Sequence, residues 1–227
     1  MSSQKQFPPG LVFSFDLESS GLLHEAADER PYLLETAFVP MDIHKRKIYK
    51  EKALHLYHQC PDLETMKQEG KVSDFVLGNE NILKVIGIAH KKGQTVEKTK
   101  EAIHNYFETF RTYSRTDESQ AKGTKKAVLF GKSIAGLDRP LLAQVYGQQW
   151  VEDLIFHEML DLVSAAQFLI HINSGIVSSV SSNKLIKELL GTEEEIPHTA
   201  LEDAFLLGKV YLEMMNRSES ILKSNDS

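Results

Sequence analysis

The chain contains very little cysteine: Cys60 is the only one among its 227 residues. A single cysteine excludes an intrachain disulfide and any metal site built from several cysteines. Long apolar runs are also absent, because no stretch approaches the roughly 18 residues that a membrane-spanning helix needs. The first residues lack the apolar segment of a secretory signal, so the sequence predicts a cytoplasmic protein.

Basic residues are not in excess either, since the formal net charge is −6. This balance argues against a large basic surface for duplex DNA, but it is compatible with an acidic site that meets phosphate through metal ions. Hydrophobic residues make up 41% of the chain and charged residues 26%, as in soluble globular proteins. Repeats and an obvious linker are absent. We therefore expect one domain at residues 11–216, between a flexible arm (1–10) and a flexible tail (217–227).

Two carboxylates stand in a predicted strand near the start of the chain. Residues 11–18 alternate with a period of two, which predicts a strand. Asp16 and Glu18 then lie on one face, roughly 6.6 Å apart along the strand. In a buried strand two such carboxylates repel each other unless they hold a cation or share a proton. The alternative is an edge strand whose acids face water, and this stretch leaves both open.

The rest of the chain predicts a mixed α/β domain. Three early strands joined by short connections indicate an antiparallel meander, and the apolar strand at 127–131 is typical of a buried central position. We expect a polar, exposed loop at 111–126. The predicted strands are 11–18, 32–39 (closed by Pro40), 47–59, 127–131 and a short one within 154–162. The predicted helices begin after Asn79 or Asn81, Thr95, Asp138 and Asp161, and two more cover about 183–190 and 199–216.

Two further aspartates and a histidine occupy positions that need an explanation. Asp203 begins an otherwise apolar stripe on the core-facing side of the last predicted helix. Its place in the first turn could also reflect a favourable interaction with the helix dipole. Asp138 follows the strand at 127–131, where it could cap the next helix or belong to a site at the end of a central strand. His198 lies five residues before Asp203, at the helix entrance.

Together these residues resemble the motifs of the DnaQ-like, DEDDh 3′-to-5′ exonucleases. DLESSGL at 16–22 resembles the first motif, DxExTG, with Ser20 where threonine is usual. GKSIAGLDRPLL at 131–142 is similar to the second, an aspartate followed by an apolar helix, and HTALED at 198–203 is similar to the third, HxAxxD. The layout is nearest to oligoribonuclease. The resemblance implies an α/β, RNase H-like fold: a mixed five-stranded sheet of order 3-2-1-4-5 flanked by helices.

The same resemblance implies roles for individual residues. Two divalent cations, Mg²⁺ or Mn²⁺, would be held by the four motif carboxylates Asp16, Glu18, Asp138 and Asp203, with Asp16 bridging both ions. Carboxylate oxygens are the ligands that these hard cations prefer. His198 would be the general base that takes a proton from the attacking water. The 3′-terminal nucleotide would be lined by Ser20, Gly21 and Leu22.

The implied substrate is the 3′ end of single-stranded nucleic acid, RNA or short oligoribonucleotides in particular, which would be cleaved to nucleoside 5′-monophosphates. Oligoribonucleases place an aromatic residue and a histidine after the third strand, whereas we identify Glu69 and Asp74 in the matching segment, 66–78. A homodimer is suggested only by this likeness. The alternatives are a DNA-directed exonuclease that proofreads or trims ends, and a non-catalytic nucleic-acid-binding domain with the same fold. All five motif residues are present, which argues against the last.

Overall fold

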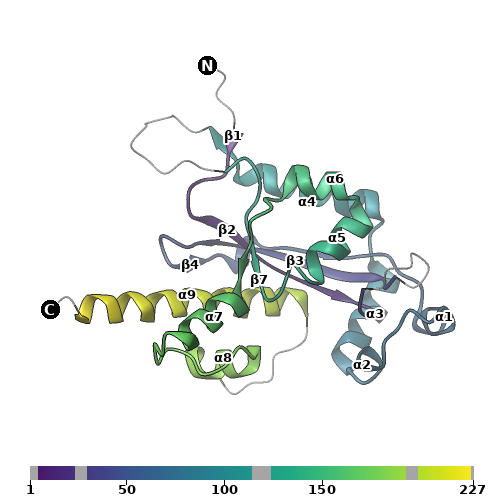
Figure 1. The fold of residues 1–227 in the computed structure, drawn as a ribbon. Helices are drawn as coiled ribbons and strands as arrows, with labels where there is room; N and C mark the ends of the chain where they lie inside the picture. Colours follow the sequence, from purple (N-terminus) through teal and green to yellow (C-terminus); the bar gives the residue numbers. More distant parts are fainter. Residues whose placement is uncertain (1–4, 24–29, 114–123, 193–198, 226–227) are drawn as a thin grey trace.

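A mixed sheet flanked by helices on both faces forms the centre of the protein (Figure 1). The computed structural model describes residues 5–23, 30–113, 124–192 and 199–225. Within them the strand order is β4-β3-β2-β7-β8, and β5 pairs with β3 on the same side as β4. The strands are β2 (Leu11–Ser19), β3 (Leu33–Asp42), β4 (Lys47–Ile48), β5 (Leu54–Tyr57), β7 (Leu129–Gly131) and β8 (Leu160–Asp161). With β4 and β5 taken together as the third strand, the predicted order 3-2-1-4-5 is confirmed.

The predicted third strand, residues 47–59, is interrupted. A 3-10 turn at Lys50–Lys52 separates β4, which pairs with the end of β3, from β5, which pairs with its first half. Pro40 does not close the second strand, as we expected, but lies inside β3 opposite Phe13. Its carbonyl accepts a hydrogen bond from the Tyr49 N–H at the interruption. Proline has no backbone N–H to donate to a neighbouring strand. Pro40 lies beside the interruption between β4 and β5, a position at which a strand tolerates proline.

The alternation along β2 separates two layers of the core. Phe13 and Phe15 are fully buried and pack with α4 and α5 on one face. Ser14 points to the other face, where its hydroxyl donates to the Ala204 carbonyl of α9 at 2.5 Å. Figure 1 shows the same division, with α4, α5 and α6 over one face and α7, α8 and α9 over the other. Asp16 and Glu18 share the side of β2 that faces α9.

The helices follow the predicted capping residues. The side chains of Asn79, Thr95 and Asp161 each accept a hydrogen bond from a first-turn N–H, so these caps are confirmed. Three short helices, α1, α2 and α6, were not predicted. Among the described helices, none has both the length and the apolar composition to cross a membrane. The bounds are α1 (Leu63–Gln68), α2 (Asp74–Leu77), α3 (Glu80–Lys92), α4 (Val96–Phe110), α5 (Asp138–Tyr146), α6 (Gln148–Leu154), α7 (Leu162–His171), α8 (Ser182–Leu190) and α9 (Ala200–Asn225).

The two ends of the chain contribute more structure than we expected. β1 (Lys5–Gln6) pairs with β6 (Thr112–Tyr113), and Phe7 is only 1% exposed. Its ring packs edge-on against Phe13 and Phe107, so the described part of the predicted arm lies against the core of the domain. At the other end, α9 continues through most of the segment predicted as a tail and ends at Asn225. Most of the predicted loop at 111–126 lies outside the described residues.

Candidate active site

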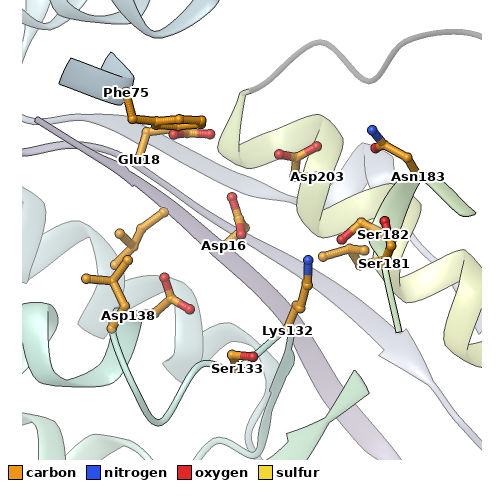
Figure 2. Close-up of a pocket in the computed structure, with 13 residues that line it drawn as sticks. Asp16, Glu18, Phe75, Lys132, Ser133, Asp138, Ser181, Ser182, Asn183 and Asp203 are labelled. Carbon is orange, nitrogen blue, oxygen red and sulfur yellow. The ribbon is translucent and has the colours of Figure 1, made fainter. Parts of the chain in front are cut away.

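The four motif carboxylates meet in one cavity of about 520 Å³ (Figure 2). Asp16 and Glu18 belong to β2, Asp138 is the first residue of α5, and Asp203 lies in the first turn of α9. β7 runs parallel to β2 and leads toward α5, which places Asp138 beside the end of β2. α9 packs on the face of the sheet that carries Asp16 and Glu18. Three elements that are far apart in the sequence thus supply one acidic cluster.

The spacing of these carboxylates fits divalent cations. One carboxylate oxygen from each of Asp16, Glu18 and Asp203 lies within 4.8 Å of the other two. Asp138 faces the same cavity, and in Figure 2 Asp16 lies between Asp138 and Asp203. Small hard cations such as Mg²⁺ and Mn²⁺ bind through carboxylate oxygens. The donor set therefore suits a divalent cation, and Asp16, Glu18 and Asp203 lie close enough together to bind the same ion.

Burial raises the pKa of every carboxyl group in this cluster. Loss of hydration is the largest cause, and it raises the pKa of Glu18 to about 8 and those of Asp138 and Asp203 to about 7. The pKa of Asp16 is raised well above its usual range, first by burial and then by the charges of Asp138, Asp203 and Glu18. Without a cation, the cluster therefore retains protons at neutral pH. A bound divalent cation would favour the ionised groups instead.

This geometry decides between the alternatives left open by the sequence. β2 pairs with β3 on one side and β7 on the other, so the interpretation of an edge strand is wrong. Asp138 is the first helical residue of α5, and Leu137 occupies the cap position, so the interpretation of Asp138 as a helix cap is wrong too. Asp203 does lie in the first turn of its helix, as predicted. There it is nonetheless aimed at a cavity with three other acids.

We expect Mg²⁺ or Mn²⁺ to raise the melting temperature more at pH 8 than at pH 6. The folded-state pKa values of these carboxyl groups, about 7 to 8, exceed their unfolded values near 4. The stability that the protonated carboxyl groups contribute is therefore fully present below about pH 4, and it is lost as the pH rises through 7 to 8. A cation that binds the ionised groups offsets that loss, and each kcal/mol adds roughly 2–4 °C.

Differential scanning fluorimetry at both pH values, with EDTA or with the cation, measures this effect. The Asp203→Asn variant should lose most of the metal-dependent shift. An equal shift at both pH values, or a shift that survives the substitution, would contradict the assignment of the cluster as a cation site.

The residues predicted to line the 3′-terminal nucleotide lie beside the cavity rather than in it. Gly21 and Leu22 line a small separate cavity of about 110 Å³, and Leu22 is 68% exposed. The Ser20 hydroxyl is buried, donates to the Lys71 carbonyl at 2.6 Å and accepts from the Tyr32 N–H at 2.9 Å. Ser20 thus joins the end of β2 to Lys71 and Tyr32 through hydrogen bonds. His198 lies outside the described residues, so its assignment stays a prediction.

The acidic cavity is also lined by side chains that the sequence analysis did not identify. Phe75 of α2 is 71% exposed and lines the same cavity as Glu18 (Figure 2). It belongs to the segment 66–78, where the resemblance implied an aromatic residue, so the sequence held a signal that we missed. Glu69, which we identified there, accepts a hydrogen bond from the Tyr32 hydroxyl at 2.7 Å instead. The described lining residues also include Lys132, Ser133, Ser181, Ser182 and Asn183.

Comparisons with known proteins agree with this fold. Neither a protein-family model nor a curated protein sequence matches the chain. The nuclease domain of 3′hExo, a DEDDh family member, bound to rAMP, matches with a TM-score of 0.60 and 14% identity, over 91% of this chain and 92% of that one. A 3′-exonuclease that recognises the 3′ end of the histone mRNA stem-loop matches with a TM-score of 0.53 and 12% identity, over 94% and 84%. Cell-death related nuclease 4 matches with a TM-score of 0.59 and 16% identity, over 91% of this chain and 64% of that one. The chain therefore has the RNase H-like fold of DEDDh nuclease domains.

Proposed function

We propose that this protein is a metal-dependent 3′-to-5′ exonuclease. It removes nucleoside 5′-monophosphates from single-stranded nucleic acid, with RNA or short oligoribonucleotides as the preferred substrate. The observation that carries the proposal is the meeting of Asp16, Glu18, Asp138 and Asp203 in one cavity of a DEDDh nuclease fold. The preference for RNA is supported by the rAMP and the mRNA stem-loop named for two proteins of similar fold.

The proposed chemistry is hydrolysis of the terminal phosphodiester. Asp16, Glu18, Asp138 and Asp203 would hold two divalent cations. Such a pair stabilises the charge that develops on the attacking and leaving oxygens. His198 takes one proton from the attacking water as the water oxygen bonds to phosphorus and the bond to the 3′ oxygen breaks. His198 must be neutral to accept that proton. The 3′ oxygen takes up a proton from solvent, so the shortened strand leaves with a 3′ hydroxyl and the terminal nucleotide leaves as a 5′-monophosphate.

We expect Phe75→Ala to weaken substrate binding without a matching loss of chemistry. The exposed Phe75 ring stands at the rim of the cavity, where the base of the terminal nucleotide can stack on it. Stacking of a base on an aromatic side chain contributes about 1–3 kcal/mol, so KM should rise roughly 5- to 150-fold while kcat changes less than about threefold. Steady-state cleavage of a short RNA measures both constants.

The matched control for Phe75 is Leu77→Ala, because Leu77 is also exposed on α2 but does not line the cavity. Its KM should stay near that of the wild type. A fall in kcat with unchanged KM in the Phe75 variant would assign this residue to the chemistry rather than to base stacking.

The proposal as a whole is tested by a gel time course with 5′-labelled RNA and DNA of two and about twenty nucleotides. Wild type and Asp203→Ala are compared with Mn²⁺ or EDTA. A ladder that shortens from the 3′ end, and that disappears with EDTA or the substitution, supports the exonuclease and reveals its preferred sugar and length. Faster loss of DNA would favour an enzyme that proofreads or trims DNA ends. No cleavage of any substrate would indicate a non-catalytic binding domain.

Two further parts of the proposal concern where and how the protein works. The resemblance to oligoribonuclease supports a homodimer, which light scattering coupled to size-exclusion chromatography measures directly. A cytoplasmic location is the other part of the proposal, and fractionation of cells tests it. A monomer at micromolar concentration would remove the homodimer from the proposal and leave the enzymatic part unaffected.

A further inference from the structure

Glu35 is a fifth carboxylate beside the cluster, and it is completely buried. It lies on β3 directly opposite Glu18 of β2, so both side chains point to the same face of the sheet. The charge of Glu35 is one of the causes that raise the pKa values of Asp203, Glu18 and Asp16. A buried acid that adds repulsion to an already acidic cluster needs a compensating role.

Both oxygens of Glu35 are engaged by other groups. Oε2 accepts a hydrogen bond from the Ala200 N–H at 3.1 Å, and Oε1 is hydrogen-bonded to Nε2 of His55 on β5. Glu35 does not belong to the group of Asp16, Glu18 and Asp203 whose oxygens lie within 4.8 Å of one another. These contacts make Glu35 a poor candidate for a further cation ligand. We call the hydrogen bonds of Glu35 with His55 and Ala200 the Glu35 tether.

The Glu35 tether ends at the first residue of α9, the helix that carries Asp203. Ala200 and Ala204 are completely buried against Ala37 and Val39 of β3, so this end of the helix lies directly on the sheet. The Ala200 N–H is one of the first-turn donors that have no partner within the helix, and a carboxylate there also interacts favourably with the helix dipole. One turn later, the Ala204 carbonyl accepts from the Ser14 hydroxyl of β2 at 2.5 Å. Asp203 thus lies between two hydrogen bonds that join α9 to the sheet.

We propose that Glu35, held by His55, is a positioning residue that fixes the first turn of α9 and thereby the placement of Asp203 relative to Asp16 and Glu18. This inference rests on the proposed metal-dependent activity of the same site. Groups that orient metal ligands in this way change metal affinity or activity by about 10- to 100-fold when they are lost. The hydrogen bonds of Glu35, rather than its charge, are the property that matters.

Two substitutions of Glu35 separate its hydrogen bonds from its charge. Glu35→Met keeps a similar volume but leaves the Ala200 N–H without an acceptor. Glu35→Gln removes the charge, yet its amide can still accept from Ala200 and donate to a neutral His55. Glu202→Gln is the matched control for charge, because Glu202 lies beside Asp203 and raises its pKa, but pairs with Lys50 instead of β3.

Three measurements on the full-length protein test the inference. They are Mn²⁺ affinity by calorimetry, hydrogen exchange of the amides at 200–203, and kcat and KM for a short RNA. In Glu35→Met we expect Mn²⁺ affinity and kcat to fall about 10- to 100-fold and exchange to accelerate, with KM nearly unchanged. Glu35→Gln and Glu202→Gln should stay within about threefold of the wild type. A Glu35→Met variant that matches Glu35→Gln in Mn²⁺ affinity and exchange would overturn the inference.

His55→Phe provides a second test if Glu35→Met does not fold, because it removes the hydrogen bond to His55 and leaves the acceptor of the Ala200 N–H in place. We expect this variant to bind Mn²⁺ about 3- to 10-fold more weakly, and wild-type affinity and exchange would overturn the inference. A wild type that cleaves no nucleic acid would refute the proposed function. Mn²⁺ affinity and hydrogen exchange would then still decide the role of Glu35, so the two failures are distinguishable.

Discussion

Asp16→Asn is expected to abolish nearly all cleavage while making the metal-free protein more stable. Asp16 is the carboxylate that the other three acids surround: Asp138, Asp203 and Glu18 all contribute to raising its pKa. Asparagine keeps the shape of the side chain but not its charge. A metal ion contributes several kcal/mol to the stabilisation of a transition state, so losing this carboxylate from the proposed cation site should lower kcat on the order of 10³-fold or more.

The expected gain in stability follows from the same burial. The pKa of Asp16 is higher in the folded than in the unfolded protein, so ionisation of this group at pH 8 opposes folding when no cation is bound. Removing the charge therefore raises the melting temperature in EDTA. A fall in activity together with a rise in melting temperature distinguishes the loss of a metal ligand from misfolding, which would lower both.

Single-turnover cleavage with Mn²⁺ and fluorimetry in EDTA at pH 8 measure the two effects. Asp153→Asn is the matched control, because Asp153 is an exposed aspartate of α6 away from the cavity, and both quantities should stay unchanged. An Asp16→Asn protein that cleaves at more than about a tenth of the wild-type rate would refute the central role assigned to this carboxylate.

How much of this site could be predicted depends on the range over which each signal acts. Asp16 and Glu18 were identifiable because a period of two fixes which residues of β2 share a face. The break between β4 and β5 could not be identified from the sequence, since a short turn at Lys50–Lys52 leaves the alternation of residues 47–59 almost unchanged. Periodicity describes neighbours along the chain. It carries no information on whether a strand continues through a turn.

Glu35 shows the same limit for a functional residue. It stood in an apolar stretch, Leu33 to Ala37, where a lone acid could have been noticed as unusual. Its partner Ala200, however, is 165 residues away in the sequence, so no local pattern reveals that the carboxylate is satisfied. The same holds for the approach of Asp203 to Asp16. The motifs indicated that these residues act together, but only the structure shows how close together they lie.

His198→Ala is expected to lower kcat about 10²- to 10⁴-fold, the contribution typical of a general base. His198 lies outside the described residues, and the prediction rests on its place in HTALED, five residues before Asp203. In the wild type, kcat at saturating Mn²⁺ should rise tenfold per pH unit below the ordinary histidine pKa of roughly 6.5 and level off above it, because only neutral imidazole accepts a proton.

The carboxyl groups of the cluster would also make activity rise with pH, because Glu18, Asp138 and Asp203 have pKa values of about 7 to 8 without a cation. Their effect acts through metal affinity and disappears when Mn²⁺ is saturating, whereas that of a general base remains. The His198→Ala variant should therefore bind Mn²⁺ as the wild type does, yet lack the pH-dependent rise in kcat. His171→Ala, at the exposed end of α7, is the control and should change neither quantity. If the His198 variant instead lost Mn²⁺ affinity in proportion to kcat, the histidine would act by holding the metal site together, and the attacking water would need another proton acceptor.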